Sequence, residues 1–548
     1  MKMKHIAWFK RSRILPEGSA HISATVNDWG GENYLRSELF STPQLERFGK
    51  KLARTHKLSP EILPYYLLKR LTDNETIITR CCYLLNAGKK TSIMPAGEWL
   101  LDNYYLIEEQ IRMVRQHLPK SFGKGLPLLA YPHRCPRIYD LASEAIAHGD
   151  GRWDTSSLTS YISAYQEVTP LTLGEIWALP GMLRLALIEN LRRVSNEVTQ
   201  AQQERNLADM WITRIFDCAE NAPADLIMIV ADMARTHPPL SSAFVAEMVR
   251  RLQGHGNALA LPLNWIEQRL AEQGVTTEIL IHRFNQQLAA SQLSVSNSIS
   301  GLRLLNETNW SDFAETISVV EQTLRLDPAG IYPHMHFDTR DHYRHVIETL
   351  ARDAILSEPE VANRVMAMSC EPSLDPEHRH IGYFLLGGGR PQLEKLLSAE
   401  RSLLKRLRQS MNKSPLLSWL GSLSLLTTAA SATILYETAL QGIFWLLIPL
   451  ALPLIVAISQ LASDMLSEAT TRFRIPRPLP RMDFSSGIPV EYATMVAIPC
   501  MLTSYESLCK LLFRLEVCSL GNQDENLCFA LLTDFPDSST EDTEENTV

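Results

Sequence analysis

Two long uncharged runs in the last third of the chain constrain its fold more than any other feature. Residues 414–436 form a run of 23 and residues 438–463 a run of 26, and a single acidic residue, Glu437, divides them. A helix needs about 20 predominantly apolar residues to cross a bilayer. The two runs therefore predict a pair of membrane helices joined as a hairpin.

Basic segments flank this hairpin on both sides, RSLLKRLRQSMNK before it and RFRIPRPLPR after it. Because loops on the cytoplasmic side of a membrane carry an excess of lysine and arginine, both flanks are predicted to be cytoplasmic. The basic residues are Arg401, Lys405, Arg406, Arg408 and Lys413 before the hairpin and Arg472, Arg474, Arg477 and Arg481 after it. The alternative is a buried helical pair in a soluble protein, since the first run contains several serine and threonine residues.

The composition excludes some classes of protein. A chain of 548 residues is long enough for two to four domains. A formal net charge of −8 at pH 7 argues against a nucleic-acid partner, which needs a concentrated basic surface. The nine cysteines form no CxxC pair, so reduced thiols are expected rather than a disulfide framework. The N-terminus has basic residues but no apolar core of adequate length, which argues against a cleaved signal peptide.

Apolar periodicity predicts a mainly helical region up to about residue 410. Thr172 and Glu175 have the spacing of a capping box, and Pro180 is expected to interrupt this helix before a second one that continues through Val194. The other predicted helices are 41–57, 61–70, 75–86, 95–117, 137–148, 209–219, 223–234, 241–252, 263–272 and 277–288, the last ending before the polar segment SQLSVSNSIS.

The C-terminal part changes character. A short apolar strand at 494–498, a helix at 505–519 and a second strand at 527–533 predict a βαβ unit with two parallel strands. Ligands of such sheets bind at the carboxyl ends of the strands. Residues 499–504 and 534–538 are predicted to lie there, and Asp534 and Asp537 are candidates to accept hydrogen bonds from a nucleotide. The alternative is that these acids only cap a helix or form a turn.

Three further patterns have some features of binding sites. His342 and His345, with Asp338 or Asp341, could bind a metal ion, although a polar helix surface beside several arginines is the competing interpretation. Glu98 and Asp102 flank Trp99 and Asn103 in the manner of a sugar-binding surface, but such pairs are also common on exposed helices. GGGR at residues 387–390 lacks the order of a phosphate-binding loop. No metal-binding residue is assigned.

Longer segments resemble the N-terminal part of the bacterial cyclic β-1,2-glucan synthases, which are inner-membrane glucosyltransferases. The resemblance extends from about Arg36 onward. It is carried by RSELFS and QLERF (36–48), EWLLDNYYLIEEQIR (98–112), PRIYDLASEAIAHGDGRWD (136–154), YQEVTPLTLGEIWALPGMLRLALIENLRR (165–193), DPAGIYPHMHFDTRDHYRHVIE (327–348), HIGYFLLGGGRP (380–391), RPLPRMDFSSGIP (477–489) and FALLTDFPD (529–537).

The resemblance implies an enzyme that uses UDP-glucose to build a β-1,2-linked glucan. The βαβ unit is then the opening of a GT-A-like nucleotide-sugar-binding domain, with Pro499 after the first strand, Glu506 at the start of the helix and Asp534 as the first acid facing the nucleotide. Mg²⁺ or Mn²⁺ is implied for the full-length family, whereas no metal ion is assigned to this chain. The expected partners are the lipid bilayer, UDP-glucose and β-glucan, and a separate chain carrying the remaining C-terminal portion.

The chain departs from the family after Asp537, because SSTEDTEENTV follows instead of the second acidic motif and the catalytic base. We therefore expect a truncated, catalytically incomplete synthase, with no catalytic residue of its own, at the bacterial inner membrane and with both ends cytoplasmic. The expected divisions are an N-terminal helical segment (1–95), a helical cytoplasmic domain (96–410), the transmembrane hairpin (414–463), a basic, proline-rich linker (464–489) and the truncated glycosyltransferase domain (490–548). The alternatives are a membrane-anchored helical interaction protein without catalysis and a soluble metal-dependent hydrolase built on the histidines.

Overall fold

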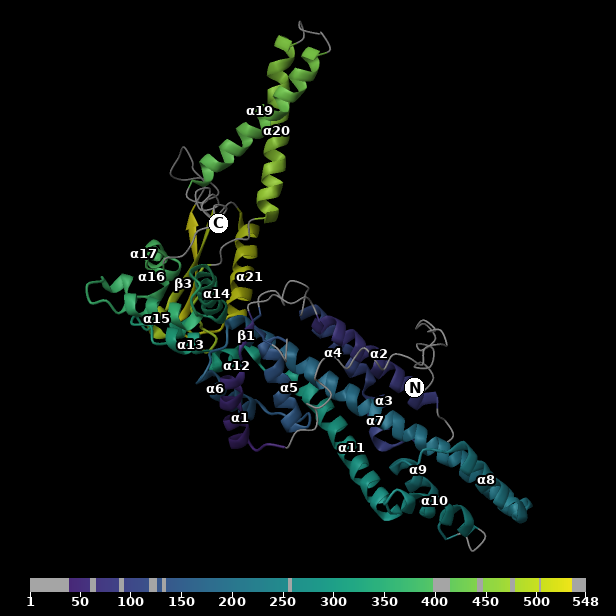
Figure 1. Ribbon diagram of the computed structural model, residues 1–548. Helices are drawn as coiled ribbons and strands as arrows, with labels where there is room; N and C mark the ends of the chain where they lie inside the picture. Colours follow the sequence, from purple (N-terminus) through teal and green to yellow (C-terminus); the bar gives the residue numbers. More distant parts are fainter. Residues whose placement is uncertain are drawn as a thin grey trace. The chain divides into compact units, whose positions relative to one another are not determined.

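The computed structural model describes residues 39–534 except for 60–65, 88–92, 118–125, 131–134, 255–258, 398–413, 441–446, 474–478 and 502–503. The basic segment before the hairpin, two arginines after it (Arg474 and Arg477) and Asp537 thus lie outside the described residues. The chain divides between Val319 and Val320 into two compact units. The fold is mainly helical, as the sequence predicts (Figure 1).

The first unit is built around one long helix, α7 (Leu173–Asn221). Its first half packs in a large apolar core to which Leu183, Leu187 and Leu191 each contribute a fully buried side chain. Its second half packs in a smaller core with α8, α9 and α10. The remaining elements are α1 (Thr42–Thr55), β1 (Leu58–Ser59), α2 (Tyr66–Ala87), α3 (Pro95–Asp102), α4 (Tyr104–His117), β2 (Leu128–Leu129), α5 (Arg137–Gly149), α6 (Thr155–Gln166), η4 (Pro223–Asp225), α8 (Leu226–Thr236), α9 (Ser242–Leu252), α10 (Ala260–Glu272), α11 (Thr277–Glu307) and α12 (Trp310–Ile317).

The capping box that starts α7 is confirmed. The Glu175 N–H donates to Oγ1 of Thr172 at 3.3 Å, and the Thr172 N–H donates to Oε2 of Glu175 at 2.9 Å. The prediction that Pro180 ends this helix is wrong, because α7 continues through it. Proline removes one helical hydrogen bond, but the neighbouring Ile176 and Leu179 are buried in the core. Their burial favours an unbroken helix. The helix predicted separately at 209–219 is part of α7.

Three other predicted boundaries are wrong. Helix α2 is continuous from Tyr66 to Ala87, where two helices were expected at 61–70 and 75–86. The helix expected at 95–117 is divided into α3 and α4 at Asn103. The polar segment after residue 290 does not end α11. Its residues Ser291, Ser294 and Ser298 are buried, so small side chains allow close packing there in place of large apolar ones.

The second unit begins with a small helical core and continues into a helical pair. The core is formed by α13 (Val319–Leu324), η6 (Tyr332–His334), α14 (Phe337–Ala354), α15 (Glu358–Ser369), η7 (Pro376–His378), α16 (Ile381–Leu385) and α17 (Arg390–Leu396). Helices α19 (Pro415–Leu440) and α20 (Leu447–Phe473) follow and lie side by side (Figure 1).

The α19–α20 pair corresponds to the two uncharged runs, with shifted ends. Glu437 does not separate the helices, because α19 continues to Leu440, and α20 extends past Ser463 to Phe473. Within the described residues, one helix, Leu416–Leu440, has the length and apolar composition to cross a membrane, and few of its residues are buried. The chain then continues through η9 (Val490–Tyr492), β3 (Thr494–Met501), α21 (Tyr505–Gly521) and β4 (Leu527–Asp534).

Candidate functional site

The strands of the C-terminal βαβ unit end at the same edge. β3 and β4 are parallel as predicted, in a register that runs from Thr494 opposite Leu527 to Met501 opposite Asp534. The exposed Asp534 is therefore the last residue of β4 and lies directly beside the last residue of β3. A side chain that follows a strand at this edge can contact a ligand bound beyond the sheet.

The amino end of α21 lies near the same edge. Helix α21 begins at Tyr505, four residues after β3 ends at Met501, so the reach of the chain limits their separation to roughly 14 Å. Ser504 caps the helix, because its Oγ accepts a hydrogen bond from the Ser507 N–H at 3.3 Å. The first turn of a helix presents main-chain N–H groups and a partial positive charge, both of which favour an anion.

Of the other two described site residues, Pro499 lies elsewhere than predicted and Glu506 lies at the start of the helix, as predicted. Pro499 does not follow β3 but lies within it, opposite Leu532. The Thr494 N–H donates to the Asn526 carbonyl, so by alternation the nitrogen of Pro499 faces away from β4 and no hydrogen bond of the pair is lost. Glu506 lies in the first turn of α21, but its carboxylate pairs with Lys510 Nζ at 2.6 Å. Asp534 and Glu506 are thus the described candidates whose positions match the prediction, although the carboxylate of Glu506 faces Lys510.

The loop before β4 binds the C-terminal end of the segment that connects the helical pair to the βαβ unit. The carboxylate of Asp524 accepts hydrogen bonds from the Ile488 N–H at 2.8 Å and from the Asn526 N–H at 2.9 Å. Bonds from Asn526 and then Ile488 lower the pKa of Asp524. The Asn526 side chain also donates to the Ile488 carbonyl at 2.7 Å. Gly487 adopts a φ of +111° just before this contact, a conformation that side chains disfavour.

The helical core of the second unit binds the N-terminal end of the same segment. Met482 pairs with Met335 in an antiparallel bridge, which is flanked by hydrogen bonds from the His336 N–H to the Arg481 carbonyl and from the Asp483 N–H to the His334 carbonyl, both 2.8 Å long. We call residues 481–488 the post-hairpin segment. Sequence reasoning treated it as a linker. One signal in the sequence indicated this packing: Met482 is an apolar residue between Arg481 and Asp483.

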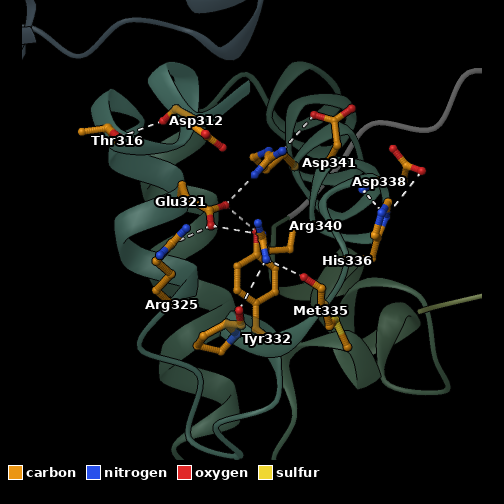
Figure 2. Close-up of polar contacts among 12 residues, drawn as sticks. Asp312, Thr316, Glu321, Arg325, Tyr332, Met335, His336, Asp338, Arg340 and Asp341 are labelled. Atoms are coloured by element: carbon orange, nitrogen blue, oxygen red, sulfur yellow. Dashed lines mark hydrogen bonds and ion pairs between the residues drawn. The ribbon is translucent and has the colours of Figure 1, made fainter. Parts of the chain in front are cut away.

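A buried carboxylate, Glu321, organises the core beside this bridge (Figure 2). Its fully buried side chain accepts hydrogen bonds from Tyr332 at 2.7 Å, from Arg344 at 2.7 Å and from Arg325 at 2.9 Å. Burial, followed by the charge of Glu321, raises the pKa of Tyr332. Arg340 lies 3.7 Å from Glu321 and also donates to the Met335 carbonyl. This cluster therefore positions the backbone to which the post-hairpin segment binds.

Two of the clustered histidines, His380 and His345, form polar contacts within this scaffold. His380 Nδ1 lies 2.8 Å from Oδ2 of Asp327. Burial alone would raise the pKa of Asp327, but the contact with His380 keeps it below its usual value. His345 lies between Asp341 and Glu348, at 3.3 and 3.2 Å. Among the described residues, no group of three His, Cys, Asp or Glu side chains could hold a metal ion.

The proposed sugar-binding surface on α3 is only partly available. Trp99 is 44% exposed, but Asn103 is buried and its side chain donates to the Trp99 carbonyl and accepts from Arg303. Its amide is thus committed to protein contacts.

The observations define a class of protein: a mainly helical chain with a helix that could cross a membrane, followed by a parallel βαβ unit. No protein-family model matches the chain. It is similar to a curated protein, cyclic beta-(1,2)-glucan synthase NdvB of Rhizobium meliloti (strain 1021), with 30% identity over 526 residues that cover 93% of this chain. The chain belongs to the cyclic β-(1,2)-glucan synthase family. It spans 18% of the length of that relative.

Proposed function

We propose that this chain forms the membrane-anchoring part of a cyclic β-1,2-glucan synthase together with the first half of its UDP-glucose-binding unit. The observation that carries the proposal is the register of β3 and β4, which brings Asp534 to the sheet edge that α21 also approaches. A carboxylate there can accept hydrogen bonds from the ribose or base of UDP-glucose, and the first turn of α21 can face its diphosphate.

In this proposal α19 and α20 form a transmembrane hairpin in the bacterial inner membrane, with both flanking segments in the cytoplasm. The apolar helix Leu416–Leu440 and the basic residues around the pair support this topology. UDP-glucose is a cytoplasmic substrate, so this topology leaves the βαβ unit on the side where the substrate is present. Domain divisions at residues 95, 410 and 489 complete the proposed organisation, and the helical pair ends with α20 at Phe473 rather than at the predicted residue 463.

We assign this chain no catalytic step. Inverting glucosyl transfer needs a carboxylate base to remove the proton of the acceptor hydroxyl, and in this family an Mg²⁺ or Mn²⁺ ion to stabilise the departing diphosphate. Asp534 ends a strand at the sheet edge, whereas the carboxylate of the nearby Glu506 pairs with Lys510. A divalent cation of this kind takes several oxygen ligands. The described residues therefore do not fit a complete metal site, and the chain is proposed to be inactive by itself.

A specific observation favours an interaction role as the second candidate. Apolar side chains on both β3 and α21 are exposed, among them Met495, Val496, Leu512 and Phe513. A two-stranded parallel sheet normally has both faces covered. A polypeptide that supplies further strands and helices, such as the remaining portion of the synthase as a separate chain, would cover them. In this second role the chain anchors its partner in the membrane and contributes two strands to a shared sheet, without binding UDP-glucose itself.

Titration of UDP-glucose into the purified full chain in detergent tests the first candidate. We expect saturable binding that Asp534→Ala weakens at least about tenfold, as for the loss of a charge-assisted hydrogen bond. Glu491→Ala is the matched control, because Glu491 is an exposed acid that precedes β3 at the opposite end of the strand. Absence of binding by the wild-type chain would leave only the interaction role.

Two further measurements separate the parts of the proposal. Extraction of membranes with alkaline carbonate should leave the chain in the membrane fraction, and its release would exclude the transmembrane hairpin. Incubation with UDP-glucose and either Mg²⁺ or Mn²⁺ should release no UDP, because we assign no catalytic base among the described residues. Measured turnover would overturn the assignment of catalytic incompleteness without affecting the family.

A further inference from the structure

The βαβ unit has no buried core of its own. Among the residues that the structure describes, none in β3, α21 or β4 is buried, and Phe513 in α21 is 66% exposed. The unit extends from Thr494 to Asp534. A segment of about 40 residues needs a core or a further stabilising contact to stay folded. Contacts with other parts of the chain are therefore expected to keep this unit ordered.

The amino ends of both strands are attached to the C-terminal end of the post-hairpin segment. Asn526, which directly precedes β4, donates from its side chain to the Ile488 carbonyl at 2.7 Å. Its main-chain carbonyl accepts a hydrogen bond of 2.8 Å from Thr494, the first residue of β3. The Asp524 carboxylate adds the bond from the Ile488 N–H. This cluster lies at the other end of the strands from Asp534, so it does not overlap the proposed ligand-binding edge.

The N-terminal end of the post-hairpin segment is attached to a folded core. The Arg481 N–H donates to Oγ1 of Thr339 at 2.9 Å, and the Arg481 carbonyl accepts from the His336 N–H at 2.8 Å. The next residue, Met482, packs against the apolar cluster formed by α13 to α17. This end of the segment therefore contacts the kind of buried core that the βαβ unit lacks.

The connection between the two ends is short and ordered. Four residues separate Asp483 from Ile488. The Ser485 N–H donates to Oδ1 of Asp483 at 3.1 Å, and the ring of Phe484 lies 5.8 Å from that of Tyr492, just before β3. When two contacts are linked by a short connection, formation of the first raises the effective concentration for the second. The two ends are therefore expected to open and close together.

We propose that the post-hairpin segment couples the βαβ unit to the helical core: it keeps the unit folded by binding the amino ends of its strands, and release of either end of the segment opens both. The stability of the helical core is thereby extended to the strands. A change in the core that frees Arg481 lowers the fraction of molecules in which the Asp534 edge is formed, and with it the apparent affinity for a ligand there. The inference goes beyond the proposed function, because it holds whether or not the unit binds UDP-glucose.

Amide hydrogen exchange of the full chain in detergent, measured by mass spectrometry without any ligand, tests the coupling from one end. Asp524→Ala removes the acceptor of the Ile488 N–H. We expect exchange in residues 481–483, at the far end of the segment, and in β3 to accelerate at least about threefold. Glu525→Ala is the matched control, because Glu525 is the next residue in the chain and an exposed acid.

Thr339→Val tests the coupling from the other end, and it keeps the test valid if Asp524→Ala does not fold. Exchange in β3 and β4 should accelerate by a similar factor, whereas Thr349→Val should leave it unchanged. Acceleration confined to the end that carries the substitution would overturn the proposal, because the two contacts would then open independently. Equal acceleration in Glu525→Ala, or acceleration that extends to α7 in the first unit, would overturn it as well, since the effect would then not pass through this segment.

Discussion

The main-chain N–H of Arg481 donates a hydrogen bond of 2.9 Å to Oγ1 of Thr339, a residue 142 positions earlier in the chain. Helices α19 and α20 lie between these two residues in sequence. The bond therefore closes a loop that contains the whole helical pair, and it joins the end of that loop to the first turn of α14. Together with the Met335–Met482 bridge, it makes the post-hairpin segment part of the helical core.

Replacement of Thr339 by valine should loosen this attachment while keeping the shape of the side chain. The Arg481 N–H loses its acceptor, at a cost of about 1 kcal/mol. Hydrogen exchange of the amides in residues 481–483 should accelerate roughly fivefold, since local opening then costs less. Thr349→Val is the control, because the Thr349 hydroxyl bonds only to the His345 carbonyl of its own helix. Equal acceleration in both variants would contradict the assigned role of Thr339.

Replacement of Glu321 by glutamine should destabilise the second unit strongly. The change removes the charge that faces Arg344, whose side chain is 4% exposed. Loss of one partner of a buried ion pair costs about 3–5 kcal/mol, and Asp341, which also contacts Arg344, should keep the loss near the lower value. Chemical denaturation followed by circular dichroism measures the change.

Arg325→Met provides a comparison within the same cluster. Arg325 contacts the same carboxylate, but its side chain is 47% exposed, so its removal should cost less than about 1 kcal/mol. A loss as large as that of Glu321→Gln would show that burial does not decide the strength of these pairs.

His345 should remain protonated well above neutral pH. Hydrogen bonds with Asp341 and then Glu348 raise its pKa to about 10. A group whose pKa is raised in the folded state stabilises the protein below its unfolded pKa, which is about 6.5 for histidine, and this contribution is lost as the pH rises through about 10. The side chain is more than half exposed, so solvent screening keeps the contribution small.

Nuclear magnetic resonance titration of the His345 ring gives the pKa directly, and Asp341→Asn should lower it. The wild-type protein should also lose stability relative to His345→Gln between pH 7 and pH 10. A pKa near 6.5 in the wild type would exclude the double ion pair with Asp341 and Glu348.

Gly151 should not tolerate a side chain. Its φ of +78° is unfavourable for alanine, and an added Cβ would lie 2.4 Å from Oγ of Ser298. The backbone conformation costs about 1–2 kcal/mol, and the overpacking adds a similar amount. Gly149→Ala is the matched control two residues earlier, where an added Cβ meets nothing within 4 Å. Comparable unfolding midpoints for the two alanine variants would contradict this packing.

Part of the fold and of the candidate site could be predicted from neighbouring residues. The capping box at Thr172 depends on a side chain three residues away, and the order of β3, α21 and β4 follows from short apolar segments of alternating type. Asp534 was predicted to follow a parallel strand for the same reason, and it is the last residue of that strand. The place of Pro499 inside β3 was not predicted. A proline can stay within a strand when its nitrogen faces away from the neighbouring strand, and the direction of that nitrogen depends on the register of the pair.

Sequence alone therefore determined the helical character of the chain, its apolar pair of helices, its βαβ unit and its family resemblance. These features depend on periodicity, length and local hydrogen bonds. Only the tertiary structure decided that α7 continues through Pro180, that Glu321 pairs with Arg344, and that Arg481 is held by Thr339. The physical reason is that burial and long-range pairing join residues far apart in the chain, and their free energy outweighs the local preferences that a sequence displays.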